Sequence, residues 1–489
     1  MRPAYDADTI RSAERPLLDS LPEGTLMQRA AFALARRCAA LLGNVYGSRV
    51  VLLVGSGGNG GDALHAGARL AGRGARVDAL LLTDRPLAPA LEALHAAGGR
   101  SMPAGTDVDT ALLRSADLVV DGMVGIGASG PLREPMARVA ATLDATAATV
   151  VAVDVPSGVD ASTGEVAGAA VRADVTVTFG ALKVGLLVDP GADHAGLVEL
   201  VDIGLRLPPP TVTALDAEDV TALLPAPAAE SDKYRRGVLG IVAGSDGYPG
   251  AANLVVGAAL ATGVGMVRFV STALAAGAVR AAHPEAVVTE IAPGDTAAML
   301  GAGRVQAWVI GPGLGTGAEA AALVRAALSA DVPVLLDADA LTIVADDRSI
   351  LKARTGPALL TPHAGELARL TGADRSSIEA QRVDAVRGAA FQTHATVLLK
   401  GSSTLVATPA GDLRVNTAAT PYLATAGSGD VLAGVCGALL AGGLDPLDAG
   451  SAGAFVHGLA GLAASGTPPH PIAAGDVVAN ISTALEDLP

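Results

Sequence analysis

Residues 420–434 read TPYLATAGSGDVLAG, and this stretch decides the fold that we expect for the second half of the chain. Gly427, Ser428 and Gly429 stand directly before Asp430, and an apolar run with helical spacing follows at once. Glycines lack a Cβ, so several backbone N–H groups can converge where the helix begins, and the helix dipole places its positive end there. The stretch therefore predicts a site for an anion such as a phosphoryl group.

Asp430 adds a candidate proton acceptor to this anion site. A carboxylate at this point can take the proton of a hydroxyl group that attacks phosphorus, so Asp430 is our candidate catalytic base. The alternative is a glycine-rich turn in which the aspartate only caps the helix.

The composition limits the classes of function. The chain has 489 residues, half of them hydrophobic, which is enough for two large α/β domains with separate cores. A net charge of −15 argues against nucleic-acid binding, which requires a basic face. The two cysteines, Cys38 and Cys436, lie too far apart in sequence for a disulfide framework or a CxxC metal site, so we expect a reducing cytoplasm.

One uncharged stretch, residues 247–267, has the length of a membrane-spanning helix. Pro249, Asn253 and several glycines interrupt it, so we interpret it as a loop followed by a buried helix. No membrane partner is expected.

Three apolar runs in the first half, residues 50–54, 118–120 and 150–153, are typical of buried parallel strands. Each run leads into a glycine-rich or aspartate-containing loop. In a parallel sheet such loops gather at one edge, which is the physical reason to treat them as one site. The candidate residues in these loops are Gly58, Asn59, Gly60, Gly61, Asp62, Asp121, Gly125, Ile126, Gly127, Ala128, Ser129, Gly130, Pro131, Asp154 and Ser157.

The second half repeats the pattern of strand, loop and helix, with expected strands at residues 238–243, 307–310, 334–336, 359–360 and 396–399. This repetition predicts a doubly wound α/β sheet with its functional loops at one edge. The loops carry Ala251, Gly313, Gly315, His363, Lys400, Gly401, Ser402, Ser403 and Thr404. Taken alone, His363 could be a helix cap and Lys400 a solvated turn residue.

Residues 208–210 are three consecutive prolines, which neither a helix nor a central strand can accommodate, so we interpret them as a linker. The sequence thus predicts two domains, residues 1–213 and residues 214–489.

The motifs also resemble known families. Asn416, Pro421, Ala424 and Thr425, followed by AGSGDVLAG, resemble the anion-hole signature of the ribokinase superfamily, and within it the NAD(P)H-hydrate dehydratases. GNGGD at residues 58–62 resembles the GNNGGD loop of the NAD(P)H-hydrate epimerases, with Gly58 where that family usually has Asn. Nearly the whole chain is similar to the bifunctional NAD(P)H-hydrate repair enzymes. The resemblance implies a Rossmann-like parallel-sheet domain followed by a ribokinase-like α/β/α domain.

For the first domain, the resemblance implies epimerisation of the hydrates NADHX and NADPHX. By analogy, K⁺ would bind Asn59, Asp121 and Ser157, and Asp154 would act as the acid or base. The hydrate would contact residues 58–62 and 125–131. Lys183 is a second polar group near a strand end.

For the second domain, the resemblance implies dehydration of the S hydrate to NADH or NADPH, with ADP or ATP as co-substrate and Mg²⁺ as cofactor. ADP is favoured because both activities are fused in this order, and its hydrolysis would give AMP and phosphate. Ala251 and His363 would contact the hydrate, and residues 400–404 the nucleotide. Gly313, Gly315 and Gly429 would belong to the ligand-binding loops.

Two other functions remain open. One is a vitamin-type small-molecule kinase, because the GSGD motif is shared across the superfamily, with a non-catalytic first domain. The other is a first domain that serves only as a ligand-binding or interaction scaffold. In either case we expect small-molecule partners, no nucleic acid, and a homo-oligomer.

Overall fold

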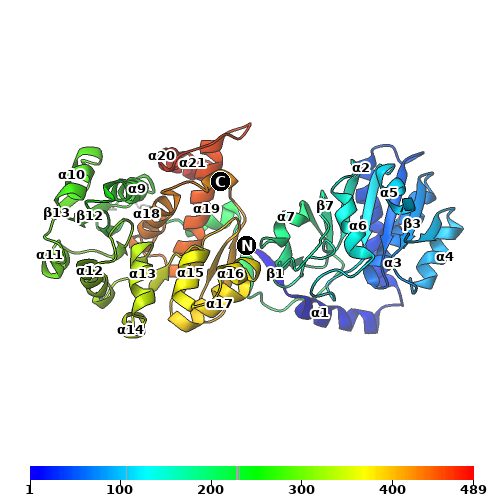
Figure 1. The fold of residues 1–489 in the computed structure, drawn as a ribbon, viewed down its shortest axis with the longest axis horizontal. Coiled ribbons are helices and arrows are strands. Elements are labelled where there is room, and N and C mark those ends of the chain that lie inside the picture. The colour runs from blue at the N-terminus through cyan, green and yellow to red at the C-terminus, as the bar shows by residue number, and fades with distance from the viewer. Residues whose placement is uncertain (106, 227–229, 231) are drawn as a thin grey trace. The chain divides into compact units, whose positions relative to one another are not determined.

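The computed structural model describes residues 1–105, 107–226, 230 and 232–489. Contacts divide the chain into two compact units (Figure 1). The N-terminal unit comprises Pro3–Val212, and the C-terminal unit comprises Thr213–Pro489 together with Met1–Arg2. Each unit is built on its own β-sheet covered by helices, which confirms the predicted α/β fold class.

The N-terminal unit has a seven-stranded sheet in the order β4-β3-β2-β5-β6-β7-β9, and every neighbouring pair is parallel. Its strands are β2 (Arg49–Val54), β3 (Arg76–Leu81), β4 (Arg100–Pro103), β5 (Leu118–Gly122), β6 (Thr149–Val153), β7 (Val175–Phe179) and β9 (Leu197–Val201). Beside this sheet, β1 (Arg2–Tyr5) pairs in parallel with β8 (Leu182–Lys183).

Helices cover both faces of this sheet. Val50, Leu52 and Val54 of β2 share a core with the helices α2 and α3, whereas Val51 and Leu53 share another core with α6. Since side chains alternate along a strand, these two cores lie on opposite faces. The helices are α1 (Ala7–Ser20), α2 (Thr25–Leu42), α3 (Gly58–Ala71), α4 (Ala88–Ala96), α5 (Asp107–Arg114), α6 (Met136–Leu143), η1 (Val184–Leu186) and α7 (Gly191–Ala195).

The sheet of the C-terminal unit runs in the order β13-β12-β11-β14-β15-β16-β17-β18-β19, with β10 (Val212–Ala214) next to β19. Its other strands are β11 (Val238–Val242), β12 (Met266–Ser271), β13 (Val287–Glu290), β14 (Ala307–Ile310), β15 (Val334–Leu336), β16 (Ala358–Leu360), β17 (Thr396–Leu399), β18 (Thr404–Ala407) and β19 (Leu413–Asn416). The pairs from β13 to β17 are parallel, whereas β17-β18 and β18-β19 are antiparallel.

The antiparallel end was not anticipated from the sequence. Residues 400–403 join β17 to β18 directly, and so short a connection permits only a hairpin, since a parallel return needs a crossover of about a dozen residues. The turn of this hairpin carries part of the predicted nucleotide loop.

Figure 1 shows helices above and below the sheet of the C-terminal unit. They are α8 (Ala217–Leu223), α9 (Pro249–Ala261), α10 (Ala273–Ala282), α11 (Thr296–Leu300), α12 (Ala318–Ser329), α13 (Asp339–Asp346), α14 (Ser349–Lys352), α15 (Ala364–Thr371), α16 (Arg375–Ala380), α17 (Arg382–Thr393), η2 (Pro421–Leu423), α18 (Ser428–Ala441), α19 (Pro446–Ser465), α20 (Ala474–Ala479) and α21 (Ile481–Glu486).

Helix α18 is the central buried helix of this unit. It packs with α9 and α19 in one apolar core. A Cβ on Gly434 would lie 2.4 Å from the carbonyl oxygen of Val255, so the glycine is what lets α18 and α9 approach so closely. The uncharged stretch around residues 247–267 thus supplies the buried helix α9. Across the part of the chain that the structure describes, every helix is too short or too polar to cross a membrane.

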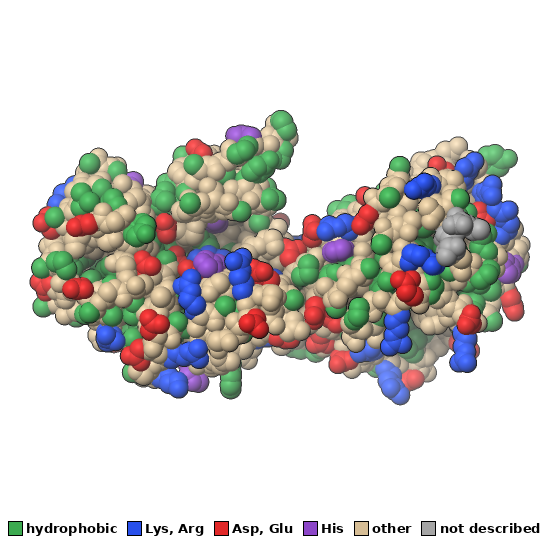
Figure 2. Space-filling view, viewed as in Figure 1, with side chains coloured by type: hydrophobic (Ala, Val, Ile, Leu, Met, Phe, Trp, Pro, Cys, Tyr) green, Lys and Arg blue, Asp and Glu red, His purple; other side chains and the backbone are tan. Residues whose placement is uncertain are grey.

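On the visible side of the surface, neither the acidic nor the basic side chains form a large continuous patch. Figure 2 shows acidic and basic side chains interspersed over each unit.

Candidate active sites

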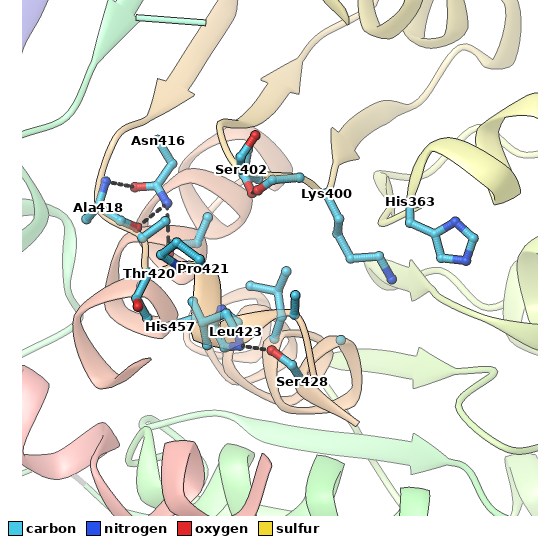
Figure 3. A pocket seen from close by; sticks show the side chains of 18 of the residues that line it. His363, Lys400, Ser402, Asn416, Ala418, Thr420, Pro421, Leu423, Ser428 and His457 are labelled. Carbon is cyan, nitrogen blue, oxygen red and sulfur yellow. Dashed lines mark hydrogen bonds between the residues drawn. The ribbon is translucent and has the colours of Figure 1, made fainter. Parts of the chain in front are cut away.

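The larger cavity, about 730 Å³, lies in the C-terminal unit where β17 and β19 end and α18 begins (Figure 3). In Figure 3, Lys400 and His363 lie on one side of it, and Asn416, Thr420 and His457 on the other. Six residues predicted from the sequence line this cavity: His363, Lys400, Gly401, Ser402, Thr404 and Gly429. The apolar part of the lining includes Pro421, Leu423, Leu432 and Ala454.

Lys400 is not the solvated turn residue of the alternative interpretation, because its side chain is only 18% exposed. Its Nζ lies 2.8 Å from Asp337 Oδ1 and 3.7 Å from Glu366 Oε2. A Cβ on Gly429 would lie 3.2 Å from the same Nζ, so the ammonium group sits beside the first turn of α18. Burial acts to lower the pKa of Lys400, but the charges of Asp337 and Glu366 outweigh it and the pKa is raised. Lys400 is therefore a fixed cation at the anion site.

Asp430 follows Gly429 in the first turn of α18. Burial, reinforced by the negative charge of Asp337, raises the pKa of Asp430 to about 7, although Lys400 acts in the opposite direction. A carboxyl group with a pKa near neutrality is suited to general-base catalysis at physiological pH.

His363 combines the two roles that the sequence left open. It caps α15, where its Nδ1 accepts hydrogen bonds from the N–H groups of Gly365 (3.0 Å) and Glu366 (3.2 Å). Its side chain is 53% exposed and also lines the cavity. Burial is the main reason why the pKa of His363 is lowered. Because Nδ1 accepts hydrogen bonds, the neutral ring carries its proton on Nε2, which lies 3.6 Å from Glu366 Oε1.

Five predicted residues lie outside the lining of this cavity: Asp430, which directly follows the lining residue Gly429, and four others. Ala251 and Gly313 are neighbours, since a Cβ on Gly313 would lie 3.0 Å from the Cβ of Ala251. Gly315 donates its N–H to Asp339 Oδ2 at 2.8 Å. Ser403 is buried in the β17–β18 turn, and its carbonyl oxygen accepts a hydrogen bond from Arg382. Their ligand contacts stay predictions.

Sequence reasoning missed His457 in the middle of α19. Its Nε2 lies 3.1 Å from the Oγ of Ser428, the first residue of α18 (Figure 3). Burial lowers the pKa of His457 to about 4, so the imidazole is neutral and positions the Ser428 hydroxyl inside the cavity. A histidine among the small and apolar residues of this helix was the available signal.

The N-terminal unit has a second cavity of about 620 Å³. It brings together eight predicted residues: Gly58, Asn59, Asp62, Gly125, Ile126, Gly127, Ala128 and Asp154. Ser129 and Gly130 line a smaller cavity of about 60 Å³ beside it. Gly60 and Gly61 are packing residues of α3, since a Cβ would lie 2.3 Å from Gly55 O and 2.8 Å from Met27 Cε respectively. Pro131 lines neither cavity.

Asp154 is held in place by Lys183, whose side chain is 1% exposed. The Lys183 ammonium group forms an ion pair with Asp154 Oδ1 and donates to Phe179 O at 2.8 Å. The same carboxylate oxygen accepts the N–H of Phe179 at 3.0 Å. Asp154 adopts φ 70°, a left-handed conformation that costs a non-glycine residue of order 1–3 kcal/mol. The surrounding contacts thus fix this carboxylate at the cavity wall.

Asp121 and Ser157 form a buried pair, and Asn59, which lines the cavity, donates to Val124 O (3.2 Å), the same carbonyl that Ser157 Oγ approaches at 3.4 Å. Asp121 is fully buried and accepts hydrogen bonds from Ser157 N (2.8 Å), Ser157 Oγ (2.7 Å) and Met123 N (3.2 Å). Burial raises the pKa of Asp121 to about 6. Among the described residues no basic side chain forms an ion pair with it. A buried carboxylate among oxygen donors fits a hard monovalent cation, so these residues agree with the K⁺ ligand set.

Sequence reasoning also missed the N-terminal helices as part of this second cavity. Arg11, Glu14 and Leu18 of α1, and Leu26 and Met27 of α2, line it. Their spacing is that of ordinary amphipathic helices, which does not indicate a role at the site.

A complete protein cage for a metal ion was not found: the described residues contain no group of three or more His, Cys, Asp or Glu side chains suited to hold one. Mg²⁺ needs fewer protein ligands, because it usually binds one or two carboxylates and the phosphates of its substrate. Asp337 and Asp339 are carboxylates near Asp430, since the charges of both raise its pKa, and Asp337 Oδ1 is already paired with Lys400 Nζ at 2.8 Å.

Each of the two units matches a family model built from known proteins. A family model for NAD(P)H-hydrate dehydratase matches residues 239–479, and a model for the YjeF-related protein N-terminus matches residues 23–185. The bifunctional NAD(P)H-hydrate repair enzyme Nnr of Mycobacterium tuberculosis is 50% identical over 450 residues, covering 91% of this chain and 90% of that protein. The enzyme of the same name from Mycobacterium leprae is 48% identical over 497 residues, with both chains covered completely.

Solved structures resemble the C-terminal unit. The ADP/ATP-dependent NAD(P)H-hydrate dehydratase from Bacillus subtilis, co-crystallised with ATP/Mg²⁺, is 30% identical, with a TM-score of 0.52, and covers 57% of this chain and 99% of its own. A ribokinase-like superfamily protein from Enterococcus faecalis shares the fold, with 22% identity and a TM-score of 0.51. The C-terminal unit thus has a ribokinase-like α/β fold. The chain as a whole belongs to the family of bifunctional NAD(P)H-hydrate repair enzymes.

Proposed function

We propose that this protein repairs hydrated nicotinamide dinucleotides with two active sites. Residues 1–213 interconvert the R and S forms of NADHX and NADPHX, and residues 214–489 return the S form to NADH or NADPH. The single observation that carries the proposal is that each unit has a cavity with a carboxyl group at it: Asp154 lines the cavity of one unit, and Asp430 directly follows Gly429, which lines the cavity of the other. The membership of the chain in the repair family supplies the substrate class.

In the C-terminal unit, the hydroxyl group of the S hydrate attacks the terminal phosphorus of the nucleotide. Asp430 accepts the hydroxyl proton, and the backbone N–H groups of residues 427–429 stabilise the negative charge on the phosphoryl oxygens. Phosphate then leaves with the C–O electron pair, and loss of a proton from the neighbouring ring carbon restores the double bond. With ADP as donor the other product is AMP.

Lys400 and the residues after it would bind the nucleotide phosphates or sugar, because the compact positive charge of an ammonium group suits a phosphate group. His363 and Ala251 would contact the hydrate. When bound, Mg²⁺ neutralises part of the polyphosphate charge, and Asp337 and Asp339 would hold it. We favour ADP as the donor on the grounds of the fused domain order.

In the N-terminal unit, Asp154 would act as acid or base at the hydroxylated ring carbon, and the loop residues 58–62 and 125–131 would hold the hydrate. Asn59, Asp121 and Ser157 would hold K⁺, which when bound compensates the buried Asp121 charge and ties three loops together. Both cysteines are buried and free, which supports a reducing cytoplasm as the location. A homo-oligomer stays an expectation.

A vitamin-type kinase is the alternative, and the fate of phosphate separates the two. Purified protein is given the S hydrate of NADHX, Mg²⁺ and ADP, and phosphate is assayed together with any phosphorylated organic product. We expect inorganic phosphate in equal amount to the NADH formed. A stable phosphorylated product from a vitamin substrate, without NADH formation, would favour the kinase.

A further inference from the structure

Asp62 of α3 stands out among the residues of the N-terminal cavity. It lines the cavity, yet the residue is only 7% exposed. Its Oδ1 is completely buried and has no hydrogen-bond partner. Within the part of the chain that the structure describes, no Lys, Arg or His forms an ion pair with it. A buried ionised carboxylate without a hydrogen bond or a cation is costly, so this environment favours the neutral acid.

The charges that face Asp62 act in the same direction. Asp154 lies near it across the cavity, and Glu14 faces it from α1. Lys183 is already neutralised by Asp154, and Arg11 forms an ion pair with Asp8. Burial, followed by the charges of Asp154 and Glu14, raises the pKa of Asp62 well above its ordinary value. Because NADHX carries phosphate charges, its binding in the cavity would disfavour an Asp62 carboxylate further.

The cavity therefore holds two carboxyl groups in opposite environments. Lys183 forms a buried ion pair with Asp154, whereas among the described residues no group forms a hydrogen bond or an ion pair with Asp62 Oδ1. Pairs of carboxyl groups whose environments drive them to opposite protonation states are suited to act as acid and base.

We propose that Asp62 is a second catalytic residue of epimerisation, which enters the reaction as a carboxylic acid and donates a proton while Asp154 accepts one. This inference rests on the proposed epimerase function of residues 1–213. It goes beyond a binding contact, which would need neither a protonated Asp62 nor an unpartnered buried oxygen.

The chemistry balances without a co-reactant. The hydrated ring carbon bears a hydroxyl group and is bonded to the ring nitrogen. Asp154 takes the hydroxyl proton, a C=O bond forms, the C–N bond breaks, and the ring nitrogen keeps the electron pair and takes the proton of Asp62. Rotation of the aldehyde presents its other face. The nitrogen then attacks carbon, returns its proton to Asp62, and the oxygen regains the proton from Asp154.

The first test compares the full-length chain with its Asp62→Asn variant, using R or S NADHX without nucleotide. We expect kcat for interconversion to fall about 10²- to 10⁴-fold, the usual contribution of a general acid. Nucleotide-dependent dehydration of the S form in the same variant reports that the rest of the chain is folded. Asp193→Asn, which removes an exposed surface partner of Arg172, is the matched control and should leave interconversion unchanged.

The second test observes the proton directly and leaves Asp62 itself unchanged. The Asp430→Asn chain is used, because Asp430 has a pKa of about 7 and would add its own signal at neutral pH. With labelled aspartate carboxyl carbons in this chain, the infrared band of a protonated carboxylic acid should be present at neutral pH, disappear as the pH rises, and be lost in Asp430→Asn/Asp62→Asn. Interconversion should be lost over the same pH range.

The outcomes separate the two claims. If the wild-type chain does not interconvert R and S NADHX, the proposed function itself fails, and this inference fails with it. If the wild type is active and Asp62→Asn keeps its kcat, or only raises KM, Asp62 is a binding residue and the inference is overturned. If the wild type is active but the Asp430→Asn chain shows no protonated Asp62 at neutral pH, the inference is overturned as well.

Discussion

Lys400 and Gly429 meet at the junction of strand β17 and helix α18, where a Cβ on Gly429 would lie 3.2 Å from Lys400 Nζ. Asp337 holds the same ammonium group from the opposite side at 2.8 Å. The glycine therefore leaves room for a cation against the first turn of the helix, at the point where backbone N–H groups already favour an anion. We therefore expect the small residue at position 429 to matter for binding rather than for folding.

Gly429→Ala should lower dehydratase activity without lowering stability. The added Cβ displaces the lysine, so we expect kcat/KM for ADP-dependent dehydration to fall about tenfold, a change of about 1.4 kcal/mol. The free energy of unfolding should not decrease, because alanine favours a helix over glycine. Gly277→Ala in α10, where a Cβ meets nothing within 4 Å, is the matched control and should keep full activity. Equal activity of the two variants would show that the Lys400 contact does not matter.

Asp430→Asn should abolish dehydration and spare epimerisation. The amide cannot accept the hydroxyl proton, so the rate should fall about 10²- to 10⁴-fold. The measurement is the return of reduced-nicotinamide absorbance with S NADHX, Mg²⁺ and ADP, alongside chromatographic assay of R and S interconversion. A variant that dehydrates at the wild-type rate would remove Asp430 from the mechanism.

The pH dependence of dehydration should follow the raised pKa of Asp430. Asp430 must be ionised to accept a proton, and its pKa is raised to about 7. We therefore expect kcat/KM to increase as the pH rises through about 7 and to decrease as the pH falls below this value. This increase of kcat/KM with pH reflects the ionisation of Asp430 in the free enzyme. It should therefore be absent from the residual activity of the Asp430→Asn variant. A profile that is flat on both sides of pH 7 would contradict the assignment.

Asp154→Asn should stop epimerisation and also destabilise the N-terminal unit. The amide leaves Lys183, 1% exposed, without a counter-charge, and breaking a buried ion pair in this way costs about 3–5 kcal/mol. Adding Lys183→Met should recover much of the lost stability, as measured by thermal unfolding, but none of the epimerase activity. Dehydration of the S form should persist in both variants. Recovery of epimerisation in the double variant would contradict a direct role for Asp154.

Much of the architecture could be predicted from local pattern. The strands at residues 307–310, 334–336 and 396–399 were expected with the bounds that the structure shows, because each is a continuous apolar run ended by a loop. Parallel pairing then brings Asn59, Asp121 and Asp154 to one edge of the N-terminal sheet. Such inferences succeed where the signal lies within a few residues.

The parts that escaped prediction depend on distant contacts. His457 is 29 residues from Ser428 along the chain, and only the packing of α19 against α18 joins them. Glu14 reaches the N-terminal cavity because α1 folds over it, which its amphipathic pattern does not indicate. The unpartnered oxygen of Asp62 is likewise a property of the assembled cavity, although the residue itself was found from its motif.

The most direct test of two cooperating sites starts from a mixture of R and S NADHX. Wild-type protein and Mg²⁺ are added with ADP or, separately, with ATP, and the reduced-nicotinamide absorbance is followed to completion. We predict complete recovery of both forms with at least one of the two nucleotides. The nucleotide that supports recovery is then the phosphoryl donor. Recovery that stops when the S form is exhausted, at a rate limited by spontaneous epimerisation, would contradict the central claim.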